Sequence, residues 1–311
     1  MSSGPVAVID IGSNSIKLLV ATRAPDGAIT PLHFRTIDAR ISAGISQADP
    51  QLSPEGRARG VDAIRALLDN ARTHAPARTI LVATSAVRDA RNGAEFREQV
   101  RLATGQEVRI LSGDEEANVI GRGLTCDRAL QGLRDFYVFD LGGGSLECLA
   151  FRDRRIEQAT SLKLGCVRLM ERFVSDVAAP FSAAEQAAVA AYVKNTIRQE
   201  GFRFHLPSGA VAVGTGGTIT TVRAILGARA GQIFEQTRAI ITVAELHELL
   251  QWLGGLSLSG RQRIPGLPPA RADVFPTALT TFIAIAELGG FTAFQNSLYN
   301  LRYGLADEAL D

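Results

Sequence analysis

The chain has 311 residues, of which 46% are hydrophobic and 21% are charged, and its formal net charge is +1. This length suggests about two domains, because single hydrophobic cores stop growing near about 250 to 300 residues. The balanced charge excludes a strong overall field that would attract nucleic acid or an anionic membrane, so a polyanion would have to be bound by a local cluster. We therefore expect neither a nucleic-acid nor a membrane partner.

The cysteines and the N-terminal segment bear on location. Cys126, Cys148 and Cys166 are odd in number and lie in apolar stretches, which favours reduced core thiols over disulfides or a metal site. The first residues show no basic region followed by an apolar core, and no apolar run approaches the ~18 residues that span a bilayer. These features predict a cytoplasmic protein.

A series of three strands occurs twice, about 130 residues apart. Each series begins with a short apolar strand, an Asp-x-Gly-x-x-Ser turn and a second strand. A long internal repeat of this kind predicts a duplicated domain and hence two lobes. The strands are expected at residues 6–9, 16–22 and 29–40, and again at 137–139, 146–151 and 156–164.

Helices are predicted between these strands, so the fold class is α/β. Three helix starts have a Ser/Thr-x-x-Glu capping box, and Ser53 with Pro54 marks a fourth. The boxes are Ser112/Glu115, Ser182/Glu185 and Thr242/Glu245. We predict an N-terminal lobe over residues 1–127 and a C-terminal lobe over 128–311. The last helix, about residues 298–311, is a candidate to pack back on the first lobe.

The two Asp-x-Gly turns are candidate phosphate loops. Glycines let the backbone approach an anion, and inward amides and hydroxyls bind its oxygens. The alternative is a pair of tight hairpins in which Asp and Gly serve conformation alone. The matched pair favours function, because turn chemistry does not require Asp at the same place twice. The candidate phosphate ligands are Ser13, Asn14 and Ser15 in the first loop and Gly142, Gly143, Gly144 and Ser145 in the second.

The leading Asp of each loop would repel phosphate, so we expect it to hold a divalent cation or its water shell. Asp140 and Glu147 are the candidate ligands for Mg²⁺ (or Mn²⁺), with Asp10 behind them.

A third glycine loop follows the apolar run 210–213 and opens a helix. A strand, a glycine loop and a helix start are a common anion-binding arrangement. Its candidate phosphate ligands are Gly216, Gly217 and Thr218, and Thr218 is also a candidate helix cap. No Gly-Lys-Ser/Thr follows, so this is not a Walker loop.

Glu116 is the candidate catalytic base. If Ser112 caps the helix, the capping box occupies Glu115, and Glu116 is left free to activate water. The alternative is that Glu116 only serves the helix dipole, as acidic residues in a first turn often do. Arg88 directly follows a buried strand over residues 79–84 and is a candidate phosphate ligand.

Together these segments resemble the exopolyphosphatase and guanosine pentaphosphate phosphatase (Ppx/GppA) family. The resemblance covers nearly the whole chain and rests on eight motifs in order. They are Val8-Ile9-Asp10-Ile11-Gly12-Ser13-Asn14-Ser15, Ala83-Thr84-Ser85-Ala86-Val87-Arg88, Ser112-Gly113-Asp114-Glu115-Glu116-Ala117, Asp140-Leu141-Gly142-Gly143-Gly144-Ser145-Leu146-Glu147, Leu164-Gly165-Cys166-Val167-Arg168, Gly214-Thr215-Gly216-Gly217-Thr218, Arg271-Ala272-Asp273 and Leu301-Arg302-Tyr303-Gly304.

The resemblance implies two actin-like, ribonuclease-H-like lobes of the sugar kinase and chaperone ATPase superfamily, with the active site in the cleft. It also implies magnesium-dependent removal of the terminal phosphate of inorganic polyphosphate, or of the 5′ γ-phosphate of guanosine pentaphosphate. The catalytic glutamate of the family falls on Glu116, and a homodimer is a common assembly. The phosphate and metal positions fall on Ser13, Asn14, Arg88, Asp140, Gly143, Gly144, Ser145 and Glu147.

Three departures from the family pattern bear on substrate preference more than on hydrolysis. Ala39-Arg40-Ile41-Ser42 stands where Val-Arg-Leu-Gly is expected, Ala270 where an acidic residue is common, and Tyr303 where Glu is usual. Two other functions stay open, because a fold does not fix a function. They are a kinase or ATPase on the same fold, and a non-catalytic sensor of polyphosphate or guanosine alarmones.

Overall fold

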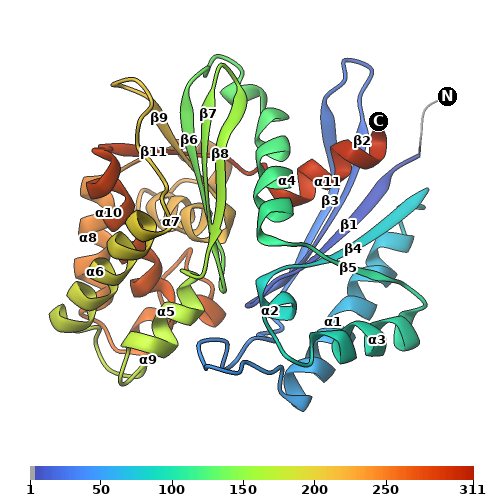
Figure 1. Ribbon diagram of the computed structural model, residues 1–311, viewed down its shortest axis with the longest axis horizontal. Coiled ribbons are helices and arrows are strands. Elements are labelled where there is room, and N and C mark those ends of the chain that lie inside the picture. Colours follow the sequence, from blue (N-terminus) through green and yellow to red (C-terminus); the bar gives the residue numbers. More distant parts are fainter. Residues whose placement is uncertain (1–3) are drawn as a thin grey trace. The chain divides into compact units, whose positions relative to one another are not determined.

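The computed structural model describes residues 4–311. These residues form two compact units, each built around one mixed β-sheet (Figure 1). Unit 1 contains the chain up to Gln131 together with Tyr299–Asp311, and unit 2 contains Gly132–Leu298. The C-terminal segment therefore belongs to the same unit as the N-terminal strands.

The sheet of unit 1 has the strand order β3-β2-β1-β4-β5. Strand β1 is antiparallel to β2 and parallel to β4, and β4 is parallel to β5. The C-terminal ends of β1, β4 and β5 therefore share one edge of the sheet, and the segments that follow them meet there. The bounds are β1 Val6–Ile11, β2 Ile16–Arg23, β3 Ile29–Ile37, β4 Arg78–Ala83 and β5 Val108–Ile110.

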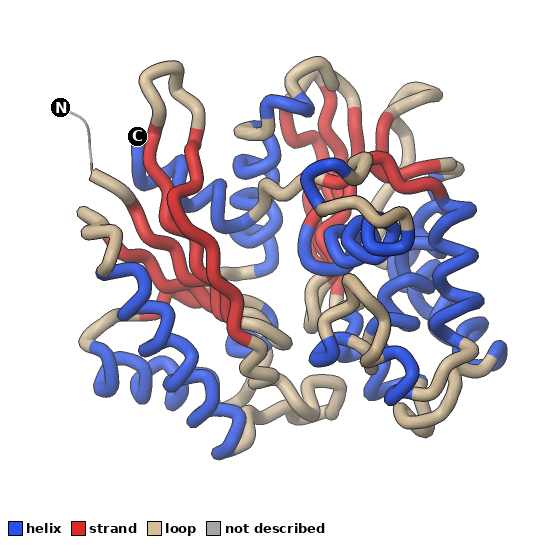
Figure 2. The backbone as a smooth tube through the Cα atoms, turned by 180° about the vertical axis from the view of Figure 1, so that it is seen from behind, coloured by secondary structure: helices blue, strands red, loops and turns tan. Residues whose placement is uncertain are grey.

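Helices cover both faces of this sheet (Figure 2). Helix α1 packs against β1, β2 and α3, and α11 packs against all three N-terminal strands and α4. A close approach of α4 and α11 requires glycine, since a Cβ at Gly123 would lie 2.1 Å from the carbonyl oxygen of Asn300. The helices are α1 Pro54–Arg72, α2 Ser85–Arg88, α3 Gly93–Thr104, α4 Gly113–Thr125, η1 Arg128–Leu130 and α11 Leu301–Leu310.

The sheet of unit 2 has the strand order β10-β11-β9-β6-β7-β8. Strands β6, β9 and β11 are parallel, so the glycine loops after β6 and β9 lie at the same edge. Strand β6 is buried along its whole length, as expected for a strand covered on both faces. The bounds are β6 Phe136–Leu141, β7 Leu146–Arg152, β8 Arg155–Leu162, β9 Val211–Thr215, β10 Ile240–Thr242 and β11 Ala293–Asn296.

The core helix of unit 2 is α10, which is buried from Phe275 to Ala286 and packs against α5, α6, α7 and α8. Helix α7 packs on β6, β9 and β11. Within residues 4–311, no helix is both long enough and apolar enough to cross a membrane. The bounds are α5 Cys166–Phe173, α6 Ala183–Gln199, α7 Gly216–Arg229, η2 Phe234–Gln236, α8 Val243–Gly254, α9 Leu258–Arg261, η3 Pro269–Arg271 and α10 Phe275–Gly289.

The helix starts follow the predicted capping chemistry. The hydroxyls of Ser112, Ser182 and Thr242 each accept a hydrogen bond from the backbone amide three residues later. In each case the residue at that position is a glutamate, whose carboxylate accepts a hydrogen bond from the backbone amide of the capping residue. Ser53 accepts the amide of Gly56, with Pro54 in the first turn of α1. All four predicted helix starts are confirmed.

The duplicated series of strands is also confirmed. Strands β1 and β2 pair with Asp10 opposite Lys17, and β6 and β7 pair with Asp140 opposite Glu147. The two turns close in the same way, because Gly12 donates its amide to the carbonyl of Ser15 at 3.2 Å and Gly142 donates to Ser145 at 3.0 Å. The two Asp-x-Gly loops are therefore equivalent parts of two related units.

Candidate functional site

In unit 1, the segments after β1, β4 and β5 come together at the shared edge of the sheet. The hydroxyl oxygens of Ser13 in the first glycine loop and Ser85 at the start of α2 lie 3.5 Å apart. The amide of Thr84 donates to the carbonyl of Ile11 at 3.4 Å. The loop after β1 and the segment leading to Arg88 thus form one surface.

Glu116 lies in the first turn of α4 and is buried, with 5% of its surface exposed. As predicted, its neighbour Glu115 is occupied by the capping box. The expectation that Glu116 is free is wrong, because Nη1 of Arg88 donates to its Oε2 at 2.7 Å. The same nitrogen donates to the carbonyl of Leu111 at 3.1 Å. A buried carboxylate needs such a charged partner.

Two carbonyls of the first loop accept hydrogen bonds from the segment that follows β3. The hydroxyl of Ser42 donates to the carbonyl of Ser13 at 3.1 Å, and the amide of Arg40 donates to the carbonyl of Asn14 at 2.9 Å. Nε of Arg40 also donates to Oδ1 of Asn14 at 3.2 Å. In a planar trans peptide the carbonyl and the next amide point in opposite directions. The amides of Asn14 and Ser15 therefore point away from this segment.

The second loop is held in the same manner by the start of α5. The amides of Cys166 and Val167 donate to the carbonyls of Gly142 and Gly143 at 3.0 and 2.9 Å. Nε of Arg168 donates to the carbonyl of Gly144 at 3.1 Å. By the same peptide geometry, three consecutive amides point away from α5. They belong to Gly143, Gly144 and Ser145, and consecutive backbone amides of this kind are donors suited to an anion.

The third loop lies beside Asp140. Gly216 has a φ of +80°, and a Cβ there would lie 2.1 Å from Oδ1 of Asp140. The residue must be glycine for both reasons. The hypothesis that Thr218 caps the helix is wrong, since α7 begins at Gly216 with Thr215 at the N-cap. Thr218 is fully buried, and Nη2 of Arg271 lies 3.3 Å from its hydroxyl.

Asp140 and Glu147 form a pair of buried carboxylates, with 9% and 2% of their surfaces exposed. They lie directly opposite each other on β6 and β7, so their side chains share one face of the sheet. The hydroxyl of Ser161 donates to Oε1 of Glu147 at 2.8 Å. Like charges directly opposite each other on paired strands repel, and a cation beside them relieves this repulsion.

This oxygen donor pair fits Mg²⁺, which commonly takes one or two protein carboxylates and completes its shell with water and phosphate. Asp10 belongs to unit 1 and lies opposite Lys17 on β2. Among residues 4–311, no cluster of three or more His, Cys, Asp or Glu side chains is arranged to hold a metal ion. Any metal here would therefore depend on ligands from water or substrate as well.

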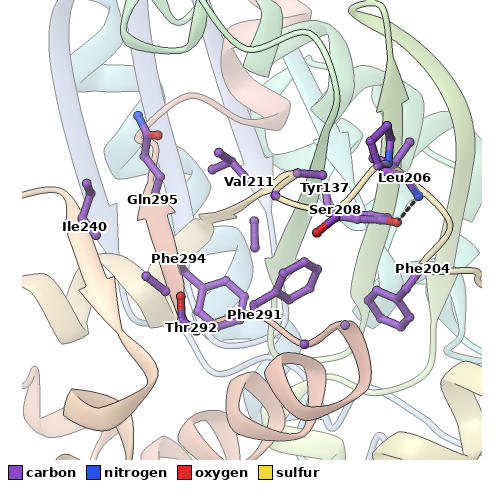
Figure 3. Close-up of a pocket in the computed structure, with 17 residues that line it drawn as sticks. Tyr137, Phe204, Leu206, Ser208, Val211, Ile240, Phe291, Thr292, Phe294 and Gln295 are labelled. Carbon is purple, nitrogen blue, oxygen red and sulfur yellow. Dashed lines mark hydrogen bonds between the residues drawn. The ribbon is translucent and has the colours of Figure 1, made fainter.

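A separate cavity of about 440 Å³ lies in unit 2 at the opposite ends of β6 and β9 (Figure 3). Tyr137, Phe204, Phe291 and Phe294 contribute rings to its wall, and the hydroxyl of Tyr137 accepts the amide of Leu206 at 2.7 Å. None of the described residues that line it is charged. The cavity is therefore unsuited to a polyphosphate.

Several residues that shape these loops are missing from the sequence-based candidates. Ser42, Ser85 and Arg168 contact loop atoms directly. Ser85 and Arg168 lie within the motifs of the resemblance, but spacing gave no reason to assign them a role.

The chain is similar to known proteins over its whole length. A guanosine-5′-triphosphate,3′-diphosphate pyrophosphatase of Vibrio parahaemolyticus is 31% identical over 313 residues, which is all of this chain and 60% of that protein. The chain thus spans less than two thirds of this curated relative.

Solved structures show the same fold. The crystal structure of an exopolyphosphatase from Cytophaga hutchinsonii has a TM-score of 0.88 at 22% identity, covering 99% of this chain and 98% of that one. The PPX-GPPA enzyme of Aquifex aeolicus has a TM-score of 0.78 at 22% identity, covering 98% and 99%. The actin-like α/β fold class predicted from the sequence is confirmed. The model of the Ppx/GppA phosphatase family matches residues 19–311, and the chain therefore belongs to that family.

Proposed function

We propose that this protein hydrolyses the terminal phosphoric anhydride of inorganic polyphosphate or of guanosine pentaphosphate. Membership of a phosphatase family and the name of the Vibrio relative support this reaction class. The observation that carries the proposal is the buried Glu116 carboxylate, held by Arg88 at the sheet edge that also bears the first glycine loop. A fixed carboxylate near a phosphate site can orient and deprotonate water.

The glycine loops supply the phosphate contacts in this proposal. Outward amides act on the negative charge of the phosphate oxygens without having to reorganise during the reaction. Arg88 has five N–H donors, so it can contact both Glu116 and a phosphate oxygen. The proposed phosphate ligands are Ser13, Asn14, Ser15, Arg88, Gly143, Gly144, Ser145, Gly216, Gly217 and Thr218. The prediction that Gly142 is a ligand is wrong, because its amide donates to the carbonyl of Ser145 and closes the turn.

Asp140 and Glu147, with Asp10, are the proposed residues for Mg²⁺ or Mn²⁺. A divalent cation bound there would neutralise charge on the phosphate oxygens. The close carboxylate pair on β6 and β7 supports this assignment, because it favours a cation in its vicinity.

The test is a phosphate-release assay on long polyphosphate, tripolyphosphate, guanosine pentaphosphate and ATP, each with and without Mg²⁺. We expect Glu116→Gln to lose about 10²- to 10⁴-fold in kcat, the usual contribution of a general base, while substrate binding is retained. Glu115→Gln is the matched control, since glutamine also serves a capping box. Equal activity of Glu116→Gln and the wild type would contradict the mechanism.

The same assay separates the alternatives. Transfer of phosphate to an acceptor other than water would identify a kinase on this fold, and tight binding without turnover in the wild type would identify a sensor. A cytoplasmic location is part of the proposal and rests on three free cysteines. The homodimer stays a prediction, which light scattering of the purified chain would test.

A further inference from the structure

The segment Leu164–Arg168 has no role in the proposed reaction, yet it contacts the second glycine loop at three consecutive carbonyls. Two of these contacts come from backbone amides at the start of α5 and exist whatever the side chains are. The third comes from a side chain, Nε of Arg168, which donates to the carbonyl of Gly144 at 3.1 Å. Only the contact to the Gly144 carbonyl therefore depends on the identity of a side chain, that of Arg168.

The direction of each carbonyl matters because the loop contains three consecutive glycines, Gly142, Gly143 and Gly144. The peptide at issue joins Gly144 to Ser145, and glycine tolerates backbone angles that other residues avoid, so this peptide is less restricted on its Gly144 side than one between two residues with side chains. If the Gly144 carbonyl turned over, the amide of Ser145 would turn with it. A carbonyl would then point where the amide had pointed and would repel an anion. The contact from Arg168 opposes this rotation.

We propose that Arg168 is a positioning residue, which fixes the peptide between Gly144 and Ser145 so that the Ser145 amide points toward the bound phosphate. The inference rests on the proposed function, because it assigns the ligand of that same site. Arg168 acts here through the loop backbone and need not touch the substrate.

Close packing supports this role. Gly165 precedes α5, and a Cβ at this position would lie 2.2 Å from the carbonyl oxygen of Gly143. The segment therefore lies directly against the loop and leaves no space for the loop to shift backward.

The first loop supplies an independent parallel. There the hydroxyl of Ser42 donates to the carbonyl of Ser13, again from the segment that follows the third strand of the repeat. The two side chains differ in charge and size, yet each donates to a loop carbonyl. The two carbonyls are neighbouring rather than equivalent positions, since Ser13 corresponds to Gly143. A side-chain donor to a loop carbonyl in both repeats favours orientation of the peptide over a role of charge.

The competing explanation is that Arg168 attracts the polyanion by its charge. Three substitutions separate the two. In Arg168→Gln, Nε2 lies the same number of bonds from the backbone as Nε of arginine and donates without charge. In Arg168→Met, a methyl group occupies that place and cannot donate. In Arg168→Lys, the charge is kept, but the donor lies one bond farther out.

The experiment measures kcat and KM for phosphate release, and the Kd of tripolyphosphate by calorimetry in a Glu116→Gln background. We expect Arg168→Gln to bind within about threefold of the arginine form and Arg168→Met to bind roughly tenfold more weakly, the usual scale for one lost hydrogen bond. Arg168→Lys should resemble Arg168→Met. If lysine rescued binding and glutamine did not, or if all three variants bound like the arginine form, the inference would be overturned.

Calorimetry needs no turnover, so it keeps this inference distinct from the proposed reaction. A chain that binds tripolyphosphate but does not hydrolyse it would contradict only the reaction. If the Arg168 variants fail to fold, Ser42→Ala tests the same principle in the first loop by removing one hydroxyl. We expect it to weaken tripolyphosphate binding by a few-fold with an unchanged melting temperature, and unchanged binding there would contradict the inference.

Discussion

Nη1 of Arg88 lies 2.7 Å from Oε2 of Glu116, and the two side chains are 21% and 7% exposed. The carboxylate comes from the first turn of α4 and the guanidinium from the end of α2, 28 residues earlier in the chain. This contact has two effects, because it neutralises the buried charge of Glu116 and also fixes the direction of its carboxylate.

We expect Arg88→Met to lower the free energy of unfolding by about 1–3 kcal/mol, because it removes the charged donor that Arg88 supplies to the buried carboxylate of Glu116. Adding Glu116→Gln to Arg88→Met should recover most of this loss, since an amide is cheaper to bury than a charge. Urea denaturation of the two single variants and the double variant measures the coupling. Strictly additive losses would show that the contact does not contribute to stability.

Gly216→Ala should disturb the carboxylate of Asp140, since the new methyl group would lie 2.1 Å from Oδ1. We expect the Mg²⁺ concentration for half-maximal phosphate release to rise about 10- to 100-fold, as for other changes beside metal ligands. Gly231→Ala is the control, because its φ of +66° gives similar backbone strain with no atom within 4 Å of the new Cβ. An equal rise in both variants would mean that strain alone is responsible.

Glu185 is expected to make stability depend on pH. Burial raises the pKa of its carboxyl, but hydrogen bonds from Ser175 and Ser182 outweigh that effect and lower the pKa from 4.5 to about 2. The folded state therefore binds the proton more weakly than the unfolded state. The stabilisation is fully present above pH 4.5 and is lost as pH falls toward 2.

In Glu185→Gln, the free energy of unfolding should fall less steeply than in the wild type between about pH 5 and pH 2. Denaturant titrations at several pH values measure the slope. Glu55→Gln, at an exposed position in the first turn of α1, provides the comparison. An unchanged slope in Glu185→Gln would show that the capping network does not link folding to protonation.

The three thiols are expected to react slowly in the folded protein. Burial, with a contribution from Asp307, raises the pKa of Cys126 to about 11, and burial raises the pKa of Cys148 and Cys166 as well. The thiolate is the reactive form, so Ellman's reagent at about pH 8 should label the native chain over hours and the denatured chain within minutes. Rapid labelling of the native chain at one site would contradict the raised pKa of that thiol.

Local patterns were sufficient for much of the fold. A capping box is a contact between residues three apart, so Ser112, Ser182 and Thr242 could be assigned from sequence alone. The repeated Asp-x-Gly turn predicted the two related hairpins because their closing bond joins Gly12 to Ser15 and Gly142 to Ser145. Interactions over such short separations depend little on the rest of the chain.

The two glycine loops illustrate the division between sequence and tertiary structure. The sequence determined that both loops exist and that each is preceded by an aspartate. Only the tertiary structure decided which way their amides point, because that depends on donors such as Ser42 and Arg168, which lie 29 and 24 residues from the loop carbonyls that they contact. It likewise decided that Glu116 is paired with Arg88. These contacts form where separate strand ends meet at one sheet edge, and periodicity along the chain carries no information about which side chains meet there.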